Sequence, residues 1–375
     1  MTHCRLCGDQ LGPVLLSLEG MPASAQNLPS AAELLADVSQ TLEIRQCVGC
    51  GLAQVSCEPV PYYREVIRAT AFSEEMRRFR QVQLSKFTAR FSLHSKRVLE
   101  VGSGCGEYLE LLDGAGMEAW GTEAGSSSVE KATRAGCRVQ KVFPEEAETV
   151  LEGGPFSAFF SFNFMEHWPR PRGVLACIRR HLTQDAVGLV EVPNFDMLIE
   201  KRMATEFIAD HLSYFTANTF RTALELSGFE VVEIEEVWHR YILSATVRKR
   251  RLLVSGPFLA GLHTQRERIA QFASGSGERG LAVWGAGHQA LASMALMGLK
   301  GRVRYVVDSA SFKQGKFTPA THFPIVSPDE LDRNPVSSIL VMAAGFSDEV
   351  VRIIRRRWGQ RFQVAILRED SFEEL

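Results

Sequence analysis

The sequence has no excess of charge of either sign and no long apolar run. Its 42 Lys and Arg residues are balanced by 44 Asp and Glu residues, and the formal net charge of −2 gives no argument for a nucleic-acid partner. No apolar stretch approaches the ~18–20 residues that a membrane-spanning helix needs. The start, Met1-Thr2-His3-Cys4, does not look like a secretion signal. We therefore expect a cytoplasmic protein with no membrane or nucleic-acid partner.

The composition is that of an ordinary globular protein, with 45% apolar and 23% charged residues. A chain of 375 residues predicts two or three domains. The eight cysteines are unevenly spread, because four of them form two C-x-x-C pairs near the start. In a cytoplasmic chain such pairs indicate metal ligands or redox centres more readily than disulfides.

Both pairs, Cys4-x-x-Cys7 and Cys47-x-x-Cys50, are followed by glycine, and about 39 residues separate them. Four thiolates make a closed tetrahedral set, which is typical of a structural Zn²⁺ site. The alternative is ordinary buried or redox cysteines, and redox exchange is disfavoured because no strand-helix pattern surrounds either pair. We predict a zinc-binding module over 1–60, with little regular structure between the pairs, and a helical connector over 61–93.

Residues 94–247 alternate strand and helix patterns, which is typical of a parallel sheet with helices on both faces. The last two strands, 229–237 and 241–246, predict an antiparallel edge. The other expected strands are 97–101, 118–122, 137–142, 156–162 and 186–192. The fold class is α/β.

A glycine-rich turn follows the first strand of this region, and its glycines are Gly102, Gly104 and Gly106. Glycines leave no Cβ where a ligand lies against the backbone, and a helix N-terminus with free N–H groups follows. Glu123 ends the next strand, where an acid can accept hydrogen bonds from a ribose. Because Glu100 precedes this G-x-G-x-G turn, the pattern favours S-adenosylmethionine (SAM).

A second α/β unit is expected over 278–375, after a linker over 248–277. Its turn, Gly285-x-Gly287-x-x-Ala290, and Asp308 fit the dinucleotide fingerprint. A NAD-linked oxidoreductase or a nucleotide-binding scaffold is therefore the less favoured alternative.

Two stretches, Phe159–Pro169 and Leu182–Asn194, resemble class I SAM-dependent methyltransferases, whose core is Rossmann-like. In that family the first stretch closes the SAM pocket. The resemblance adds Asn163, Met165 and His167 to Glu100, Glu123 and the three glycines as cofactor-binding residues.

The whole chain resembles the three-part C-methyltransferases that act on nucleotide-linked deoxysugars. The likeness is carried by the two cysteine pairs, by 210–215, and by 307–322 with its Lys313-Gln314-Gly315. The chain departs from the family at Asp210, where the family has Glu, and at Ile208, where it has Tyr. The resemblance implies a small-molecule substrate, most simply a nucleotide-linked keto-deoxysugar, and a monomer or homodimer.

Methylation of a carbon beside a carbonyl needs a base that removes the α-proton, and His211 is our candidate because imidazole titrates near neutral pH. Asp210 or a nearby backbone group would orient it. Asn194, Tyr214 and Lys313 are candidate substrate-binding residues, although a packing role is favoured for Asn194 and Tyr214. The alternative reaction is O- or N-methylation of a sugar or natural-product intermediate.

Overall fold

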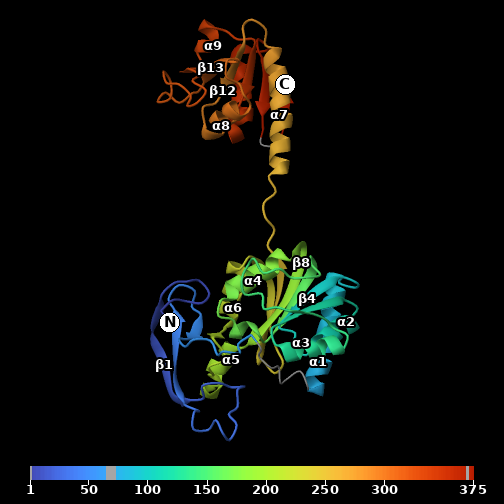
Figure 1. Ribbon diagram of the computed structural model, residues 1–375. Coiled ribbons are helices and arrows are strands. Elements are labelled where there is room, and N and C mark those ends of the chain that lie inside the picture. Colours follow the sequence, from blue (N-terminus) through green and yellow to red (C-terminus); the bar gives the residue numbers. More distant parts are fainter. Residues whose placement is uncertain (1, 65–72, 369–370) are drawn as a thin grey trace. The chain divides into compact units, whose positions relative to one another are not determined.

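The computed structural model describes residues 2–64, 73–368 and 371–375. The chain forms two compact units, Met1–Arg251 and Leu252–Leu375, and each is described by itself (Figure 1). No helix of the described residues is long and apolar enough to cross a bilayer.

The first unit contains a seven-stranded sheet in the order β10-β11-β8-β7-β4-β5-β6. The central strands are parallel, whereas β11 is antiparallel to both of its neighbours, as predicted for this edge. The strands are β4 (Arg97–Val101), β5 (Glu118–Glu123), β6 (Arg138–Lys141), β7 (Phe156–Phe162), β8 (Leu182–Pro193), β10 (Phe229–Val237) and β11 (Ile242–Lys249).

Helices cover both faces of this sheet because successive strand residues point to opposite sides. Leu99 packs into a core with α4 and α6, and Val98 packs into a second core with α1 and α2 (Figure 1). The helices are α1 (Glu74–Phe91), α2 (Glu107–Gly114), α3 (Ser126–Arg134), α4 (Pro171–Arg180), α5 (Phe195–Glu200) and α6 (Ala217–Leu226), with short 3₁₀ turns η2 (Met165–His167) and η3 (Ala204–Glu206). Ser73 caps α1 through its hydroxyl.

The N-terminal residues form a separate sheet in the order β1-β2-β3-β9. Its strands are β1 (Leu11–Met21), β2 (Gln40–Cys47), β3 (Ala53–Val55) and β9 (Ser213–Tyr214). The expectation of little regular structure between the cysteine pairs was wrong, because β1 and β2 pair antiparallel over most of their length. Alternation of Leu16 and Leu18 with Ser17 and Glu19 was the available signal.

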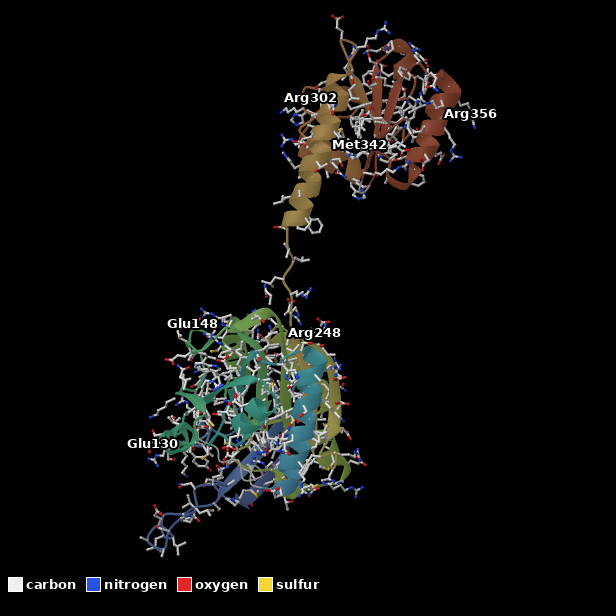
Figure 2. The ribbon with its side chains drawn as sticks, turned by 90° about the vertical axis from the view of Figure 1, so that its right-hand side faces the viewer. Glu130, Glu148, Arg248, Arg302, Met342 and Arg356 are labelled. Atoms are coloured by element: carbon white, nitrogen blue, oxygen red, sulfur yellow. The ribbon has the colours of Figure 1, made fainter. Side chains whose placement is uncertain are left out.

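The second unit has a six-stranded sheet in the order β14-β13-β12-β15-β16-β17, parallel except for the last pair. Its strands are β12 (Leu281–Trp284), β13 (Val303–Val307), β14 (Ile325–Val326), β15 (Ser338–Val341), β16 (Gln363–Leu367) and β17 (Phe372–Glu374). Its helices are α7 (Gly256–Ser274), α8 (His288–Leu296), α9 (Glu330–Arg333) and α10 (Ser347–Trp358), with a 3₁₀ turn η4 (Ala344–Phe346). Met342 is buried, whereas Arg356 projects outward (Figure 2).

Most of the segment expected to be a linker is helix α7. Its last two turns bury Ile269 and Phe272 in the core of the second unit, which explains why the segment folds. The N-terminal half of the helix is exposed, and Phe258 keeps 75% of its surface in contact with solvent. This absence of a buried stripe over the first turns is why the sequence pattern did not indicate a helix.

Candidate functional site

The glycine-rich turn lies where β4 ends and α2 begins, and all three glycines have positive φ (74°, 57° and 96°). A Cβ on Gly102 would stand 2.3 Å from the Phe164 ring, and one on Gly106 would stand 2.8 Å from the Cys137 sulfur. These two glycines therefore admit neighbouring side chains, and the expectation that all three present bare backbone to a ligand needs correction. Gly104 meets only the carboxylate tip of Glu107, at 3.3 Å.

Glu123, at the end of β5, is buried and accepts hydrogen bonds from the backbone N–H groups of Gly104 (2.9 Å) and Gly125 (2.8 Å). Its carboxylate thus fixes the glycine-rich turn from the neighbouring strand. Glu100 is fully buried on β4, at the same edge of the sheet.

The residues after β7 reach the same edge of the sheet. Asn163 has φ of 48°, and its backbone N–H donates to the Glu191 carbonyl (3.0 Å). Phe164 then packs against Gly102, and η2 contains the buried Met165 and His167. The structure therefore places the three glycines, Glu123, Asn163, Met165 and His167 at the carboxyl ends of β4, β5 and β7, and their binding of a cofactor stays a prediction.

His211 lies next to His167, with ring centroids 4.8 Å apart and an interplanar angle of 73°. Burial lowers the pKa of His167 to about 4, and burial together with the neighbouring His167 holds the pKa of His211 well below its usual range. Both imidazoles are therefore neutral at neutral pH. The two segments are joined because the Leu212 N–H donates to the Glu166 carbonyl (2.8 Å).

The Asp210 side chain does not reach the His211 ring in the described part of the chain. Its carboxylate accepts instead from the Ala25 N–H and the Tyr62 hydroxyl, both at 2.8 Å. The Asp210 carbonyl lies 2.7 Å from Nδ1 of His167. Asp210 thus orients His167 through its backbone and anchors the N-terminal residues through its carboxylate.

The other expected substrate ligands are engaged within the protein. Asn194 caps α5 by accepting from the Met197 N–H (3.3 Å), and its amide donates to the Arg240 carbonyl (2.8 Å). The buried Tyr214 hydroxyl accepts from the Ile208 N–H at 3.0 Å. These contacts give both residues a structural role, and substrate binding by either of them stays a prediction.

Lys313 belongs to the second unit and forms an ion pair with Asp308 at 2.9 Å. The Asp308 carboxylate also accepts from the Ala286 N–H (2.8 Å) and the Ala310 N–H (2.9 Å). These contacts tie the second glycine-rich turn to β13, in the same way as the Glu123 contacts tie the first turn to β5. They also place Lys313 in a network within its own unit.

The four paired cysteines converge, with all sulfur atoms within 4.8 Å of one another. The sulfurs of Cys4 and Cys50 are 3.6 Å apart, and those of Cys7 and Cys47 are 3.4 Å apart. Zn–S bonds of about 2.3 Å in a tetrahedron require sulfurs about 3.8 Å apart, close to these values. The Gln54 amide donates to the Cys4 sulfur (3.3 Å), a contact that stabilises a thiolate. The cluster therefore fits a zinc ion.

A buried ion pair near this edge of the sheet was not predicted from the sequence. Arg80 on α1 and Glu191 on β8 form a fully buried ion pair. The Glu191 carboxylate also accepts from the Gln83 amide (2.6 Å) and the Ser244 hydroxyl (2.9 Å). The sequence feature that could have indicated this pair is the charged Glu191 between the apolar residues Val190 and Val192. Because the Glu191 carbonyl binds the Asn163 N–H, the pair connects α1 to the loop after β7.

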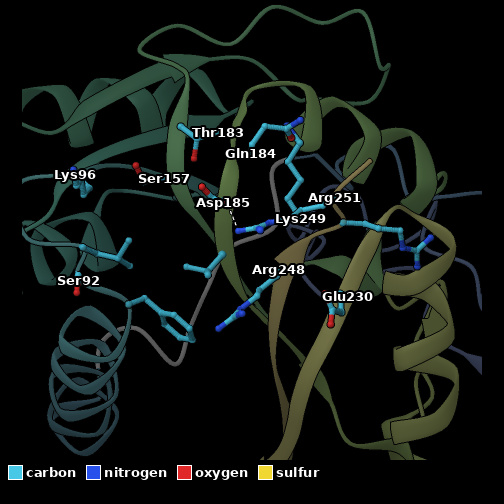
Figure 3. Close-up of a pocket in the computed structure, with 14 residues that line it drawn as sticks. Ser92, Lys96, Ser157, Thr183, Gln184, Asp185, Glu230, Arg248, Lys249 and Arg251 are labelled. Carbon is cyan, nitrogen blue, oxygen red and sulfur yellow. Dashed lines mark hydrogen bonds and ion pairs between the residues drawn. The ribbon is translucent and has the colours of Figure 1, made fainter. Parts of the chain in front are cut away.

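A hollow of 650 Å³ lies at the opposite edge of the sheet, where Lys96, Ser157 and Thr183 mark the amino ends of strands (Figure 3). It contains the basic run 248–251, in which Arg251 pairs with Asp185 (2.5 Å) and Lys249 donates to the Leu182 carbonyl (2.8 Å). Ligands of open α/β sheets bind at the carboxyl ends of strands, so this hollow is not the candidate site.

The comparisons with known proteins agree with this geometry. The methyltransferase domain model matches residues 76–234, and the model of the C-methyltransferase C-terminal domain matches residues 256–366. The chain is 21% identical to the C-methyltransferase NovU of Streptomyces niveus over 393 residues, which cover 93% of this chain and 91% of NovU.

Solved methyltransferase structures align with about half of the chain. The plantazolicin methyltransferase BpumL in complex with SAH is 13% identical with a TM-score of 0.40, and it covers 49% of this chain and 86% of its own. A SAM-dependent methyltransferase from Aquifex aeolicus is 18% identical with a TM-score of 0.38, and it covers 46% of this chain and 92% of its own.

The sheet order and the two domain matches define a class I SAM-dependent methyltransferase. The match of the second unit to the C-terminal domain of C-methyltransferases, and the alignment of NovU along almost the whole chain, support a SAM-dependent C-methyltransferase. These findings confirm the family predicted from the sequence, and we set aside the NAD-linked oxidoreductase.

Proposed function

We propose that this C-methyltransferase transfers a methyl group from SAM to a carbon beside the keto group of a nucleotide-linked deoxysugar, with His211 as the base. The observation that carries the proposal is the contact between His211 and His167. Phe164 packs on Gly102, and His167 lies three residues after Phe164. The neutral His167 ring, with His211 in contact with it, is therefore near the glycine-rich turn. The acceptor class comes from the resemblance of 210–215 and 307–322.

The cofactor would rest on the turn at Gly104, with Glu123 accepting hydrogen bonds from its ribose. Gly104 supports this placement because a Cβ there would meet only the flexible tip of Glu107. Glu100, Asn163, Met165 and His167 would border the same pocket, as the family resemblance implies. SAM supplies an activated methyl group, so the protein has only to hold a nucleophile in line at about 3–3.5 Å.

His211 would take the α-proton of the keto sugar. Its lowered pKa keeps the ring neutral and able to accept a proton at neutral pH. The imidazolium formed in this buried site would be stabilised by the negative charge that develops on the enolate, since opposite charges nearby favour the charged form. A general base of this kind contributes about 10²–10⁴-fold to the rate.

We also propose that Cys4, Cys7, Cys47 and Cys50 hold one structural Zn²⁺. The fit of their sulfur spacing supports this role. With four protein ligands no coordination position remains open, so the ion would serve the fold and take no part in methyl transfer.

The test of the base uses His211→Ala. We expect turnover to fall by about 10²–10⁴-fold while the dissociation constant for SAM stays near that of the wild type. His239→Ala is the matched control, because His239 keeps 76% of its side chain exposed. Unchanged turnover in His211→Ala would remove this residue from the mechanism.

Isotope exchange distinguishes carbon methylation from O- or N-methylation. A substrate deuterated at the α-carbon should lose its label to solvent only if that carbon is deprotonated. Full retention of deuterium during methyl transfer would contradict the enolate route and support the alternative acceptors.

A further inference from the structure

Three side chains with ligand atoms converge beside the glycine-rich turn: Glu166, His167 and His211. One ligand atom from each lies within 4.8 Å of the others. His167 Nε2 is 4.0 Å from the Glu166 carboxylate, and the two imidazole rings are in edge contact. In the described ranges this is the second such cluster, and it contains no cysteine.

The hydrogen bonds around the cluster aim its atoms inward. Nδ1 of His167 faces the Asp210 carbonyl at 2.7 Å, and a carbonyl only accepts, so we assign the proton to Nδ1. Nε2 therefore holds a lone pair and faces Glu166. Histidines that bind metals commonly donate their other N–H to a backbone carbonyl in this way. The Leu212 N–H, bonded to the Glu166 carbonyl, holds the two segments together.

The donor set selects a class of cation. Two imidazoles and one carboxylate suit divalent transition metals, whereas Mg²⁺ and Ca²⁺ prefer oxygen ligands alone. Metal bonds of about 2.0–2.2 Å in a tetrahedron require the three atoms to come about 3.3–3.6 Å apart, a closure within reach of side-chain rotation. His211 is only partly buried, whereas Glu166 and His167 are buried.

We propose that Glu166, His167 and His211 bind one divalent transition-metal ion, such as Zn²⁺ or Co²⁺, separately from the four-cysteine cluster. An imidazole nitrogen bound to a metal cannot accept a proton. The metal-bound form would therefore be inhibited, and this consequence alone rests on the proposed role of His211 as the base.

Cobalt spectroscopy tests the site in the full-length protein without an affinity tag. Protein first supplied with one equivalent of Zn²⁺ is titrated with Co²⁺, and visible absorption is recorded. We expect d–d bands that saturate near one equivalent of cobalt, without the thiolate-to-cobalt charge transfer that a cysteine site would give. Absence of cobalt bands, or bands that always carry thiolate charge transfer, would overturn the proposal.

Variants assign the ligands. Glu166→Gln and His211→Asn should each abolish the saturable bands, whereas His288→Asn should keep them because His288 is exposed in the second unit. Equal bands in all three variants would refute the assignment. X-ray absorption at the cobalt edge of the wild type gives a test that does not depend on the folding of a variant, since it must show nitrogen and oxygen neighbours and no sulfur.

The result is independent of the proposed reaction because no substrate or turnover enters the measurement. If His211→Asn loses cobalt but keeps methyl transfer, the role of His211 as base fails and the metal site stands. If it loses methyl transfer while its cobalt bands match those of the wild type, the metal site fails and the base stands.

Discussion

The buried ion pair between Arg80 and Glu191 gives a quantitative prediction. The exposed fractions of the two side chains are 1% and 0%, and the guanidinium also lies 4.2 Å from the centre of the Phe162 ring. Removing one partner leaves the other as an unpaired buried charge, which costs about 3–5 kcal/mol. We expect this loss of unfolding free energy in both Arg80→Met and Glu191→Leu.

The double variant decides whether charge pairing is the cause. If the two losses were independent, the double variant would lose about 6–10 kcal/mol, much of the stability of an ordinary domain. Because it leaves no unpaired charge, we expect Arg80→Met/Glu191→Leu to be more stable than either single variant. A buried pair replaced by apolar residues is often neutral or stabilising.

The assay is urea denaturation followed by far-ultraviolet circular dichroism, analysed for the transition of the first unit. The control is Arg134→Met, which removes the exposed pair between Arg134 and Glu130 and should change the unfolding free energy by no more than about 0.5 kcal/mol. Single-variant losses below about 1 kcal/mol, or strictly additive losses in the double variant, would refute the reasoning.

Three further predictions follow from the described contacts. Gly102→Ala should destabilise the first unit by about 2–5 kcal/mol, because it adds left-handed backbone strain and a collision with Phe164. The control Gly136→Ala has a similar φ and open space around it, so it should cost only the backbone strain of about 1–2 kcal/mol. Equal melting temperatures of the two variants would contradict this prediction. Metal analysis of Cys47→Ser should show loss of about one zinc ion per chain, and a wild type purified without chelators that contains no zinc would refute the site. Burial alone would raise the pKa of Asp308, but hydrogen bonds from Lys313 and from the Ala310 and Ala286 N–H groups outweigh burial and lower the pKa. The second unit should therefore lose stability as the pH falls below the ordinary pKa of Asp. Asp308→Asn should weaken this acid dependence, which a pH series of denaturation midpoints would measure.

The sequence could predict the parts of the fold in which local pattern and packing agree. Strands such as 97–101 and 229–237 are short apolar or alternating runs whose burial follows from their period, and the structure has the same bounds. Helix α7 was missed because the side chains of its first turns are mostly exposed, and only Leu262 packs partly against the core there. The strands β1 and β2 were missed because prolines and glycines between the cysteine pairs obscured a real alternation.

For the candidate site, sequence reasoning could name the residues at strand ends but not all of their partners. Glu123 and Gly104 meet because they follow neighbouring parallel strands, which the pattern implies. The Asp210 carboxylate accepts a hydrogen bond from Tyr62 and does not contact His211, because distant segments of the chain pack in that way. The spacing of residues in the sequence cannot predict such a partner. The same holds for Asn194, whose amide is used by the adjacent helix and by Arg240.

The pairing of β3 with β9 connects the cysteine cluster to the segment that carries His211. Gln54 contacts the Cys4 sulfur through its side chain and pairs with Ser213, two residues from His211, through its backbone. We therefore expect oxidation or alkylation of the four cysteines to disturb the pairing of β3 with β9 and, through it, the segment that carries His211. If the cysteines hold zinc and His211 is the base, as we propose, thiol reagents and chelators should reduce turnover. Replacing residues 1–60 by an unrelated fold would remove the strand that pairs with β9, close to His211.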